Sequence, residues 1–173
     1  MKSISFIPSK FHRVAVLIDV QNMYHSAKHL YQSRLNFKEA VRAAVDNRQM
    51  TRAIAYVIRT ESGEEKAFLE ALAKNGIETR EKDLQTFPGG VKKADWDVGI
   101  AMDAVKIGNR LDALIVMSGD GDFVPLIEYL HEVYGIRVEV AAFSRSASQR
   151  LREAADSFLD LGADRKKFLI PIR

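Results

Sequence analysis

The chain has 173 residues, of which 47% are hydrophobic, and carries a formal net charge of +3. This composition is typical of one folded domain with its own core and excludes a largely disordered chain. No apolar run approaches the ~20 residues needed to cross a bilayer, and residues 1–10 lack the apolar core of a signal peptide. The absence of cysteine excludes disulfides, thiolate catalysis and cysteine-ligated zinc. We therefore expect a cytoplasmic protein without membrane contact, whose modest positive charge permits an anionic partner.

Strand and helix patterns alternate along the chain. Asn36 and Ser62 are each followed three residues later by glutamate, which is the spacing of a capping box at a helix start. Gly76 and Gly135 stand where helices are expected to end. In chain order the expected elements are strand 14–18, helices 22–33 and 36–47, strand 53–58, helix 62–75, strand 77–84, helix 96–108, strand 112–118, helix 123–134, strand 136–143, helix 146–155 and strand 158–161.

This alternation predicts parallel β-α-β units with helices on both faces of one sheet. We expect an α/β fold with three layers, a doubly wound and mainly parallel sheet of five to six strands. The polar strand 77–84 and the short strand 158–161 are expected at edges. Residues 1–12 are interpreted as a tail, 13–162 as the domain, and 163–173 as a C-terminal tail that packs on the domain or docks onto a partner, with packing favoured. The basic stretch 87–93 is expected to form a flexible loop.

The two most apolar strands lead into aspartates. Asp19 follows the run 14–18, and Asp120 and Asp122 follow the run 113–117. If these strands are neighbours at the point where strand order reverses, the three carboxylates meet in one crevice at the carboxyl edge of the sheet. Like charges this close are unfavourable unless they are protonated or neutralised. A divalent cation would neutralise them, and ligands that are all oxygen favour Mg²⁺ or Mn²⁺ over zinc.

These aspartates also have structural interpretations. Asp120 is followed by glycine, which is typical of a turn, although we favour a site residue. Asp122 stands where it could cap the helix that begins at Phe123. Capping and metal ligation are compatible for a residue at that position, so both remain open for Asp122.

The helix expected at 96–108 carries aspartates in an otherwise apolar pattern. Asp103 shares a stripe with Ile100 and Ile107, where a carboxylate is costly unless it is paired or bound to metal. Asp97 lies about 120° away round the helix axis, in the first turn, and is better placed to reach the crevice. The alternatives are that Asp97 or Asp95 caps the helix and that Asp103 pairs with an arginine.

Neutral polar and basic residues near the expected crevice are candidates for substrate contact. Asn22 could cap the first helix or hold a phosphate or a metal-bound water. Ser118 has no histidine partner for nucleophilic work, and it either contacts substrate or bonds the neighbouring loop. Lys92, Lys93 and Arg145 lie in loops on the crevice side, where they could bind phosphates. Scattered solvated charge is the alternative for each of the basic residues.

Three stretches in this order resemble the NYN domain, and the LabA-like bacterial branch of the PIN-like nuclease superfamily is the nearest match. The resemblance extends over residues 13–161, and the family often has glycine where this chain has Ala94. The stretches are Ile18-Asp19-x-x-Asn22, Lys93-Ala94-Asp95-Trp96-Asp97-Val98 with Ile100-Ala101-Met102-Asp103-Ala104, and Ser118-Gly119-Asp120-Gly121-Asp122-Phe123-Val124-Pro125.

The resemblance implies a PIN-like, Rossmann-like fold and a metal-dependent ribonuclease. Members of the family are similar to enzymes in which acidic residues bind Mg²⁺ or Mn²⁺ and activate water on an RNA phosphodiester, leaving a 5′-phosphate and a 3′-hydroxyl. Asn22 would be the accompanying polar residue and Asp103 an accessory aspartate. The acidic set that binds metal and performs catalysis would be Asp19, Asp97, Asp120 and Asp122.

Two other functions remain in view. The first is a regulator that binds RNA or protein and keeps the fold, since some LabA-like proteins are known as regulators. The second is a phosphatase of the haloacid dehalogenase type, which would need an acid two residues after Asp19, where this chain has Gln21. The sequence leaves open the RNA substrate, the number of metal ions and whether the chain associates with itself or with another protein.

Overall fold

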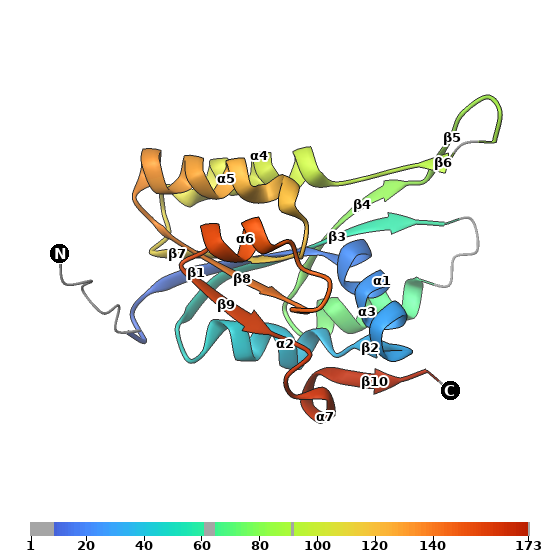
Figure 1. Ribbon diagram of the computed structural model, residues 1–173, viewed down its shortest axis with the longest axis horizontal. Coiled ribbons are helices and arrows are strands. Elements are labelled where there is room, and N and C mark those ends of the chain that lie inside the picture. Colours follow the sequence, from blue (N-terminus) through green and yellow to red (C-terminus); the bar gives the residue numbers. More distant parts are fainter. Residues whose placement is uncertain (1–8, 61–64, 91, 173) are drawn as a thin grey trace.

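A six-stranded sheet forms the centre of the protein in a computed structural model that describes residues 9–60, 65–90 and 92–172 (Figure 1). Its strands are β1 (Arg13–Asp19), β3 (Gln49–Arg59), β4 (Glu78–Asp83), β7 (Ala113–Met117), β8 (Arg137–Ala142) and β9 (Ser157–Asp160). They lie in the order β4-β3-β1-β7-β8-β9, and every neighbouring pair is parallel. This is the strand order of a doubly wound sheet, so the predicted α/β fold is confirmed.

Helices cover both faces of the sheet. Figure 1 shows α4 and α5 above it and α1, α2 and α3 below it. The helices are α1 (Val20–Tyr31), α2 (Phe37–Val45), α3 (Lys66–Lys74), α4 (Asp97–Gly108), α5 (Val124–Tyr129), α6 (Gln149–Ala154) and α7 (Arg165–Phe168), with a 3-10 turn η1 (Gly121–Phe123) before α5 and a π-helical turn η2 (Leu130–Tyr134) after it. Among the described residues, no helix has the length and apolar character needed to cross a membrane.

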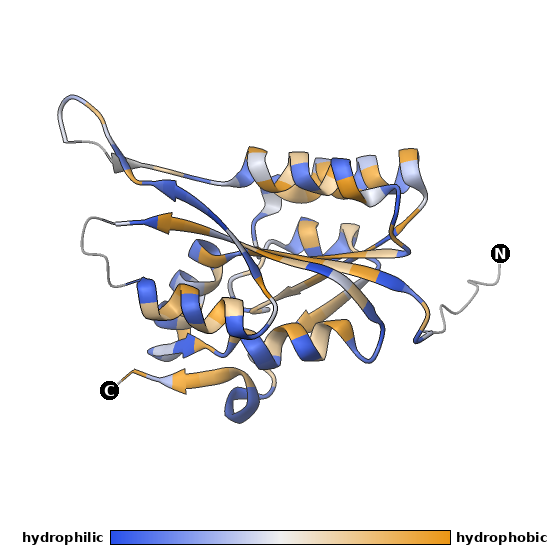
Figure 2. Ribbon diagram, turned by 180° about the vertical axis from the view of Figure 1, so that it is seen from behind, coloured by the Kyte–Doolittle hydropathy of each residue, from blue (hydrophilic) through white to orange (hydrophobic). Residues whose placement is uncertain are grey.

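Burial follows the sequence pattern of the strands. Residues 14–18 of β1 and 113–117 of β7 are completely or almost completely buried, because central parallel strands have helices on both faces. The edge strands β4 and β9 carry half-buried and exposed side chains, which confirms the edge positions predicted for them. Hydrophobic residues accordingly follow the central strands in Figure 2.

The C-terminal residues pack against the domain instead of extending from it. The strand β10 (Leu169–Pro171) pairs antiparallel with β2 (Ser33–Leu35), and the side chain of Phe168 is buried. The Asn36 N–H also donates to the Phe168 carbonyl over 2.8 Å. The favoured interpretation of the apolar C-terminal stretch, packing on its own domain, is therefore confirmed, whereas the three-residue strand β2 was not predicted.

The basic stretch predicted as a loop is part of a hairpin. The strands β5 (Gln85–Thr86) and β6 (Lys92–Lys93) pair antiparallel, and the turn between them contains two glycines with positive φ, Gly89 and Gly90. The hairpin projects beyond the sheet (Figure 1). The backbone of Lys92 and Lys93 is described, but their side chains lie outside the described part of the structure.

Helix ends match several predicted signals. The Asn36 side chain accepts a hydrogen bond from the Glu39 N–H and caps α2. Gly76 and Gly135 adopt positive φ after their helices, as the left-handed ends of helices require. The capping residue predicted at Ser62 lies outside the described residues. The single helix predicted over 123–134 is divided into η1, α5 and η2.

Candidate metal centre

The carboxyl ends of β1 and β7 meet at one edge of the sheet. The two strands are hydrogen-bonded neighbours, with Ile18 paired to Met117. The strand order reverses between them, and a crevice outside the carboxyl ends is the usual ligand site of such sheets. The predicted meeting of Asp19 with the segment 118–122 at this edge is thus confirmed.

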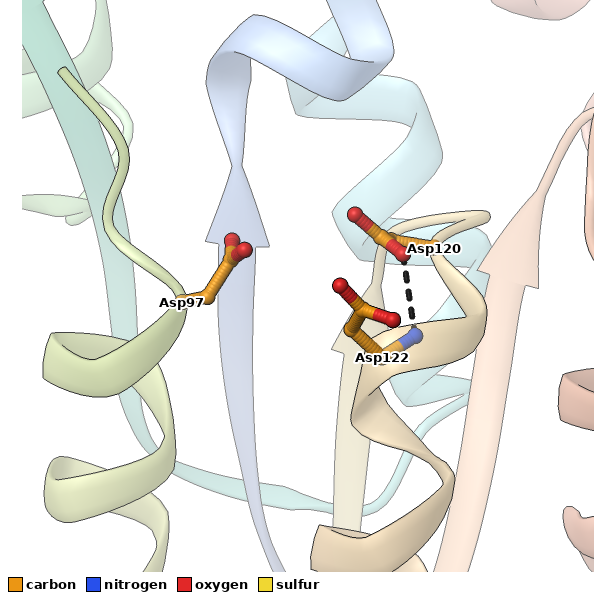
Figure 3. A group of neighbouring side chains, drawn as sticks. All are labelled: Asp97, Asp120 and Asp122. Carbon is orange, nitrogen blue, oxygen red and sulfur yellow. Dashed lines mark hydrogen bonds between the residues drawn. The ribbon is translucent and has the colours of Figure 1, made fainter. Parts of the chain in front are cut away.

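Three carboxylates gather there. Asp97, Asp120 and Asp122 each offer one oxygen, and these oxygens lie within 4.8 Å of one another (Figure 3). Asp97 is the first residue of α4, and the other two belong to the turn that links β7 to α5. Asp97 and Asp120 are half-buried and Asp122 is exposed. This convergence of α4 with the segment after β7 agrees with the aspartate pattern predicted from the sequence.

Burial and nearby negative charge make Asp97 a weaker acid. Burial, together with the smaller effects of the charges of Asp19, Asp120 and other aspartates, raises the pKa of Asp97 from 3.8 to about 6. Burial also raises the pKa of Asp19, although hydrogen bonds from Asn22 and Ser118 oppose the shift. A divalent cation would remove this repulsion, and a donor set of carboxylate oxygens suits a hard cation such as Mg²⁺ or Mn²⁺.

Asp19 lies beside the three clustered carboxylates without belonging to them. One of its oxygens accepts from the Asn22 N–H over 3.1 Å, which caps α1, and the other accepts from the Ser118 hydroxyl over 3.1 Å. A carboxylate oxygen has two lone pairs, so these bonds leave capacity for a further ligand. Asp19 is close enough to raise the pKa of Asp97.

Two predicted substrate contacts make internal hydrogen bonds. The Oδ1 atom of the Asn22 side chain accepts from the Gly119 N–H over 2.9 Å. The buried Ser118 hydroxyl accepts from the Asp120 N–H over 3.2 Å. The interpretation of Asn22 as a helix cap is wrong because Asp19 caps α1 instead, and the interpretation that Ser118 bonds its neighbouring loop is confirmed.

The cap of the turn after β7 is Asp120. Its carboxylate accepts from the Asp122 N–H over 2.9 Å (Figure 3), and Asp120 is the residue that precedes η1. The prediction that Asp122 caps the following helix is wrong, because η1 begins two residues earlier than the predicted helix. Asp122 therefore presents an exposed carboxylate to the cluster.

Both glycines of the segment 118–122 lie under the loop between β8 and α6. A Cβ atom on Gly119 would lie 3.1 Å from the Ala147 Cα, and one on Gly121 would lie 2.7 Å from the Ser148 hydroxyl. The Ser148 N–H donates to the Gly119 carbonyl over 2.9 Å. Glycine is required here for close approach of another segment, which the turn interpretation from sequence did not include.

Asp103 lies outside the acidic cluster. It accepts a hydrogen bond of 2.8 Å from the Tyr56 hydroxyl, and the Arg80 Nε lies 3.4 Å from the same oxygen. Burial and this bond raise the pKa of Tyr56 above its ordinary range. The interpretation that Asp103 pairs with an arginine is confirmed. Trp96, in the same stripe, also reaches β3, where its ring N–H donates to the Val57 carbonyl over 3.1 Å.

Two neighbours of the cluster were missed. Asp95 is exposed, and its charge contributes to the raised pKa values of Asp19 and Asp97. The Lys82 ammonium lies 4.3 Å from the centre of the Trp96 ring and donates to the Asp95 carbonyl over 2.8 Å. Asp95 could have been recognised from the sequence, because it stands two residues before Asp97. Lys82 could not, because it lies in β4, far from Asp95 along the chain.

Two arginines near this edge of the sheet, Arg59 and the predicted phosphate ligand Arg145, have different surroundings. Arg59 makes ion pairs with Asp83 and Glu81 at the carboxyl end of β3, so its charge is already partly neutralised. Arg145 is exposed in the loop between β8 and α6. Both arginines are exposed, and Arg59 is the one whose charge is already engaged by acidic neighbours.

A doubly wound parallel sheet whose switch point carries side chains for a ligand defines a class of α/β domains, and in this chain those side chains are carboxylates that could hold a divalent cation. The chain belongs to the NYN domain family, whose model matches residues 13–162, within the PIN-like nuclease superfamily. It is 27% identical over 168 residues to the low amplitude and bright protein LabA of Synechococcus elongatus, covering 91% of this chain and 86% of that one. The crystal structure of a protein of unknown function from Vibrio parahaemolyticus is 32% identical, with a TM-score of 0.85, covering 95% of this chain and all of that one.

Proposed function

We propose that the protein is a metal-dependent endoribonuclease that hydrolyses RNA phosphodiester bonds. The observation that carries this proposal is the convergence of Asp97, Asp120 and Asp122, whose oxygens lie within 4.8 Å of one another at the sheet's switch point. Membership of a family within the PIN-like nuclease superfamily supports the same reaction. The products would be a 5′-phosphate and a 3′-hydroxyl.

The role of each acidic residue in metal binding would depend on its position in the crevice. Asp97, Asp120 and Asp122 would hold one or two Mg²⁺ or Mn²⁺ ions, with Asp19 as a further ligand or as a partner of bound water. When bound, the cations would polarise the scissile phosphate, lower the pKa of the attacking water and stabilise the leaving oxygen. Asp19 also holds the segment after β7 in place through Ser118.

Phosphate binding would fall to groups around the cluster. Arg145 is exposed in the neighbouring loop, and Lys92 and Lys93 stand in the hairpin before α4. Asn22 and Ser118 would act through the backbone they bind, because both are engaged with residues 119 and 120. We therefore expect their substitution to disturb metal binding as well as RNA binding.

Cleavage of single-stranded and structured RNA by the purified protein in Mn²⁺ or Mg²⁺ tests the proposal. We expect cleavage to require metal and to fall by a factor of at least about 100 in Asp120→Asn, the order seen when a group that stabilises a transition state is removed. Asp46→Asn is a matched control, because it removes one exposed carboxylate at the opposite edge of the sheet. Cleavage at the wild-type rate by pure Asp120→Asn would rule out the assignment.

A regulator that binds RNA or protein without cleaving RNA is the second candidate. The LabA relative carries a name that describes no reaction. RNA binding that persists in a chelator, together with the absence of cleavage in either metal, would favour this function. Loss of binding on chelation would instead place RNA at the metal centre.

A further inference from the structure

The helices α4 and α5 lie side by side on one face of the sheet (Figure 1). The Tyr134 hydroxyl at the end of η2, which continues α5, donates to the Val105 carbonyl of α4 over 2.9 Å. A Cβ atom on Gly108 would lie within 3.0 Å of both Tyr134 and Leu130, so the helices are packed closely there. Because α4 leads into β7 and α5 follows it, both helices run opposite to that strand and parallel to each other.

An apolar strip runs along the outer surface where these helices meet. We call it the α4–α5 seam and define it by Val98 and Met102 on α4 and Tyr129 and Val133 on α5 and η2. These side chains are 74%, 50%, 40% and 54% exposed. The Tyr129 ring packs edge-on against Tyr134, the residue that reaches across to α4, which places Tyr129 on the flank of α5 nearest α4.

Charges of opposite sign border the seam on its two sides. Lys106 and Arg110 are exposed on α4 and in the turn after it. Lys106 lies on the flank away from α5, since it is 3.9 Å from Asp103, which contacts β3. Glu128 and Glu132 are exposed on α5 and η2, one helical turn apart. The seam is thus bordered by bases along α4 and by acids along α5.

We propose that a second copy of this chain covers the α4–α5 seam in a two-fold symmetric dimer. A two-fold axis that runs along the seam, parallel to both helices, places α4 of each protomer over α5 of the other with the same direction. Because the seam lies along this axis, its apolar side chains face the same side chains of the second copy. The seam of each protomer then covers the seam of the other.

The charge pattern favours a second copy of the chain as the partner, because the two borders of the seam are complementary to each other. The same two-fold axis brings the basic border of α4 against the acidic border of α5 in the partner, twice in each dimer. Lys106 and Arg110 then face Glu128 and Glu132 of the partner subunit, so that unlike charges meet at both rims. An apolar centre with a charged rim is the usual anatomy of a protein interface. The net charge of +3 per chain opposes association only weakly.

Molar mass measured by light scattering across a concentration series tests the dimer. We expect the 173-residue protein to show twice the mass of one chain and Met102→Glu to show the mass of one chain. Ile170→Glu is the matched control, because it places the same charge on an exposed apolar side chain of β10 on the opposite side of the fold, and it should stay dimeric. Circular dichroism on each variant establishes that the fold is retained.

Swapping the charges on the two borders of the seam tests whether the dimer forms through this surface and not through another. Lys106→Glu alone, and Glu128→Lys with Glu132→Lys, should each weaken the dimer at least about tenfold, as expected for opposed like charges. Combining all three substitutions should restore most of the affinity. A wild-type protein that is monomeric at about 100 µM, a concentration that detects contacts of Kd in that range, would overturn the proposal. The proposal would also be overturned if Met102→Glu stayed dimeric. Continued weak dimerisation of the variant that combines all three charge substitutions would overturn it as well.

Discussion

The Ser118 hydroxyl donates a hydrogen bond of 3.1 Å to the Asp19 carboxylate, and this contact joins the ends of two neighbouring strands at the acidic edge of the sheet. The same hydroxyl accepts from the Asp120 N–H. One buried side chain therefore fixes the first strand's aspartate relative to the cluster. Asp19 combines two tasks: it caps α1 and it adds negative charge beside Asp97.

Replacing Ser118 with alanine should weaken both the fold and the metal centre. The variant leaves an oxygen of the half-buried Asp19 without its donor, and we expect the free energy of unfolding to fall by about 1–2 kcal/mol. The hydrogen bond from Ser118 lowers the pKa of Asp19, so its loss should raise that pKa further and weaken Mn²⁺ binding. Urea unfolding and calorimetric titration with Mn²⁺ measure the two effects. Ser157→Ala, at an exposed serine of β9, is the control, and equal behaviour of the two variants would contradict the prediction.

Asp97 should make the metal-free protein less stable as pH rises. Burial and neighbouring carboxylates raise its pKa from 3.8 to about 6. The folded state then binds the proton more tightly than the unfolded state, so this contribution to stability is complete below pH 3.8 and is lost as pH rises through about 6. Asp97→Asn should therefore stabilise the metal-free protein at neutral pH and flatten the pH dependence. Denaturant unfolding from below pH 3.8 to neutral pH measures the free energy of unfolding of both proteins. An Asp97→Asn variant that is less stable than the wild type at neutral pH would be inconsistent with the raised pKa.

Mn²⁺ should reverse the loss of stability that the metal-free protein shows as pH rises. A cation binds the ionised carboxylates, so metal binding competes with the proton on Asp97 and should strengthen as pH rises through about 6. The apparent melting temperature in Mn²⁺ should then rise with pH in the wild-type protein. In Asp120→Asn the gain from metal should be largely absent, and an equal gain in that variant would place the metal elsewhere.

Asp103 should contribute to the stability of the fold and not to metal binding. Asp103→Ala removes the acceptor of the Tyr56 hydroxyl and the partner of Arg80, and we expect a loss of about 1–3 kcal/mol in the free energy of unfolding. Tyr56→Phe should remove the same bond, so the double variant should lose less than the sum of the two. Mn²⁺ affinity should be unchanged in all three. A folded Asp103→Ala that no longer binds Mn²⁺ would instead make it part of the metal centre.

Gly119 should tolerate a side chain less well than Gly121. A Cβ atom on Gly119 meets the backbone of Ala147 at 3.1 Å, whereas one on Gly121 meets only the side chain of Ser148, with the hydroxyl at 2.7 Å, which can rotate away, and the Cβ at 3.1 Å. We expect Gly119→Ala to cost about 1–3 kcal/mol and Gly121→Ala less, because overpacking against backbone is not easily relieved. Thermal unfolding compares the two variants. A larger loss in Gly121→Ala would show that the Ser148 side chain is held in place.

The central strands and the position of the acidic crevice could be predicted because apolarity alone identifies them. The runs 14–18 and 113–117 are unbroken by polar residues, and such strands are buried on both faces of a parallel sheet. Their shared carboxyl edge then follows from topology, which brings Asp19 and Asp120 to the same place. The first turn of α4 was found because Asp97 interrupts an apolar pattern.

Other features depend on contacts between distant segments and left no local signal. The partners of Asp103 come from β3 and β4, and the segment that requires Gly119 comes from the loop before α6. The exchange of capping roles between Asp120 and Asp122 depends on whether the turn begins as a 3-10 helix, which residue types alone do not decide. The short strand β2 forms only because β10 returns to pair with it.

Anomalous diffraction from crystals soaked in Mn²⁺ tests most directly whether the three clustered carboxylates form a metal centre. We expect an anomalous peak between Asp97, Asp120 and Asp122, in contact with their carboxylate oxygens, and we expect it to disappear in crystals of Asp120→Asn. Absence of the peak from the wild-type protein, or a peak bound only at another site, would contradict the assignment.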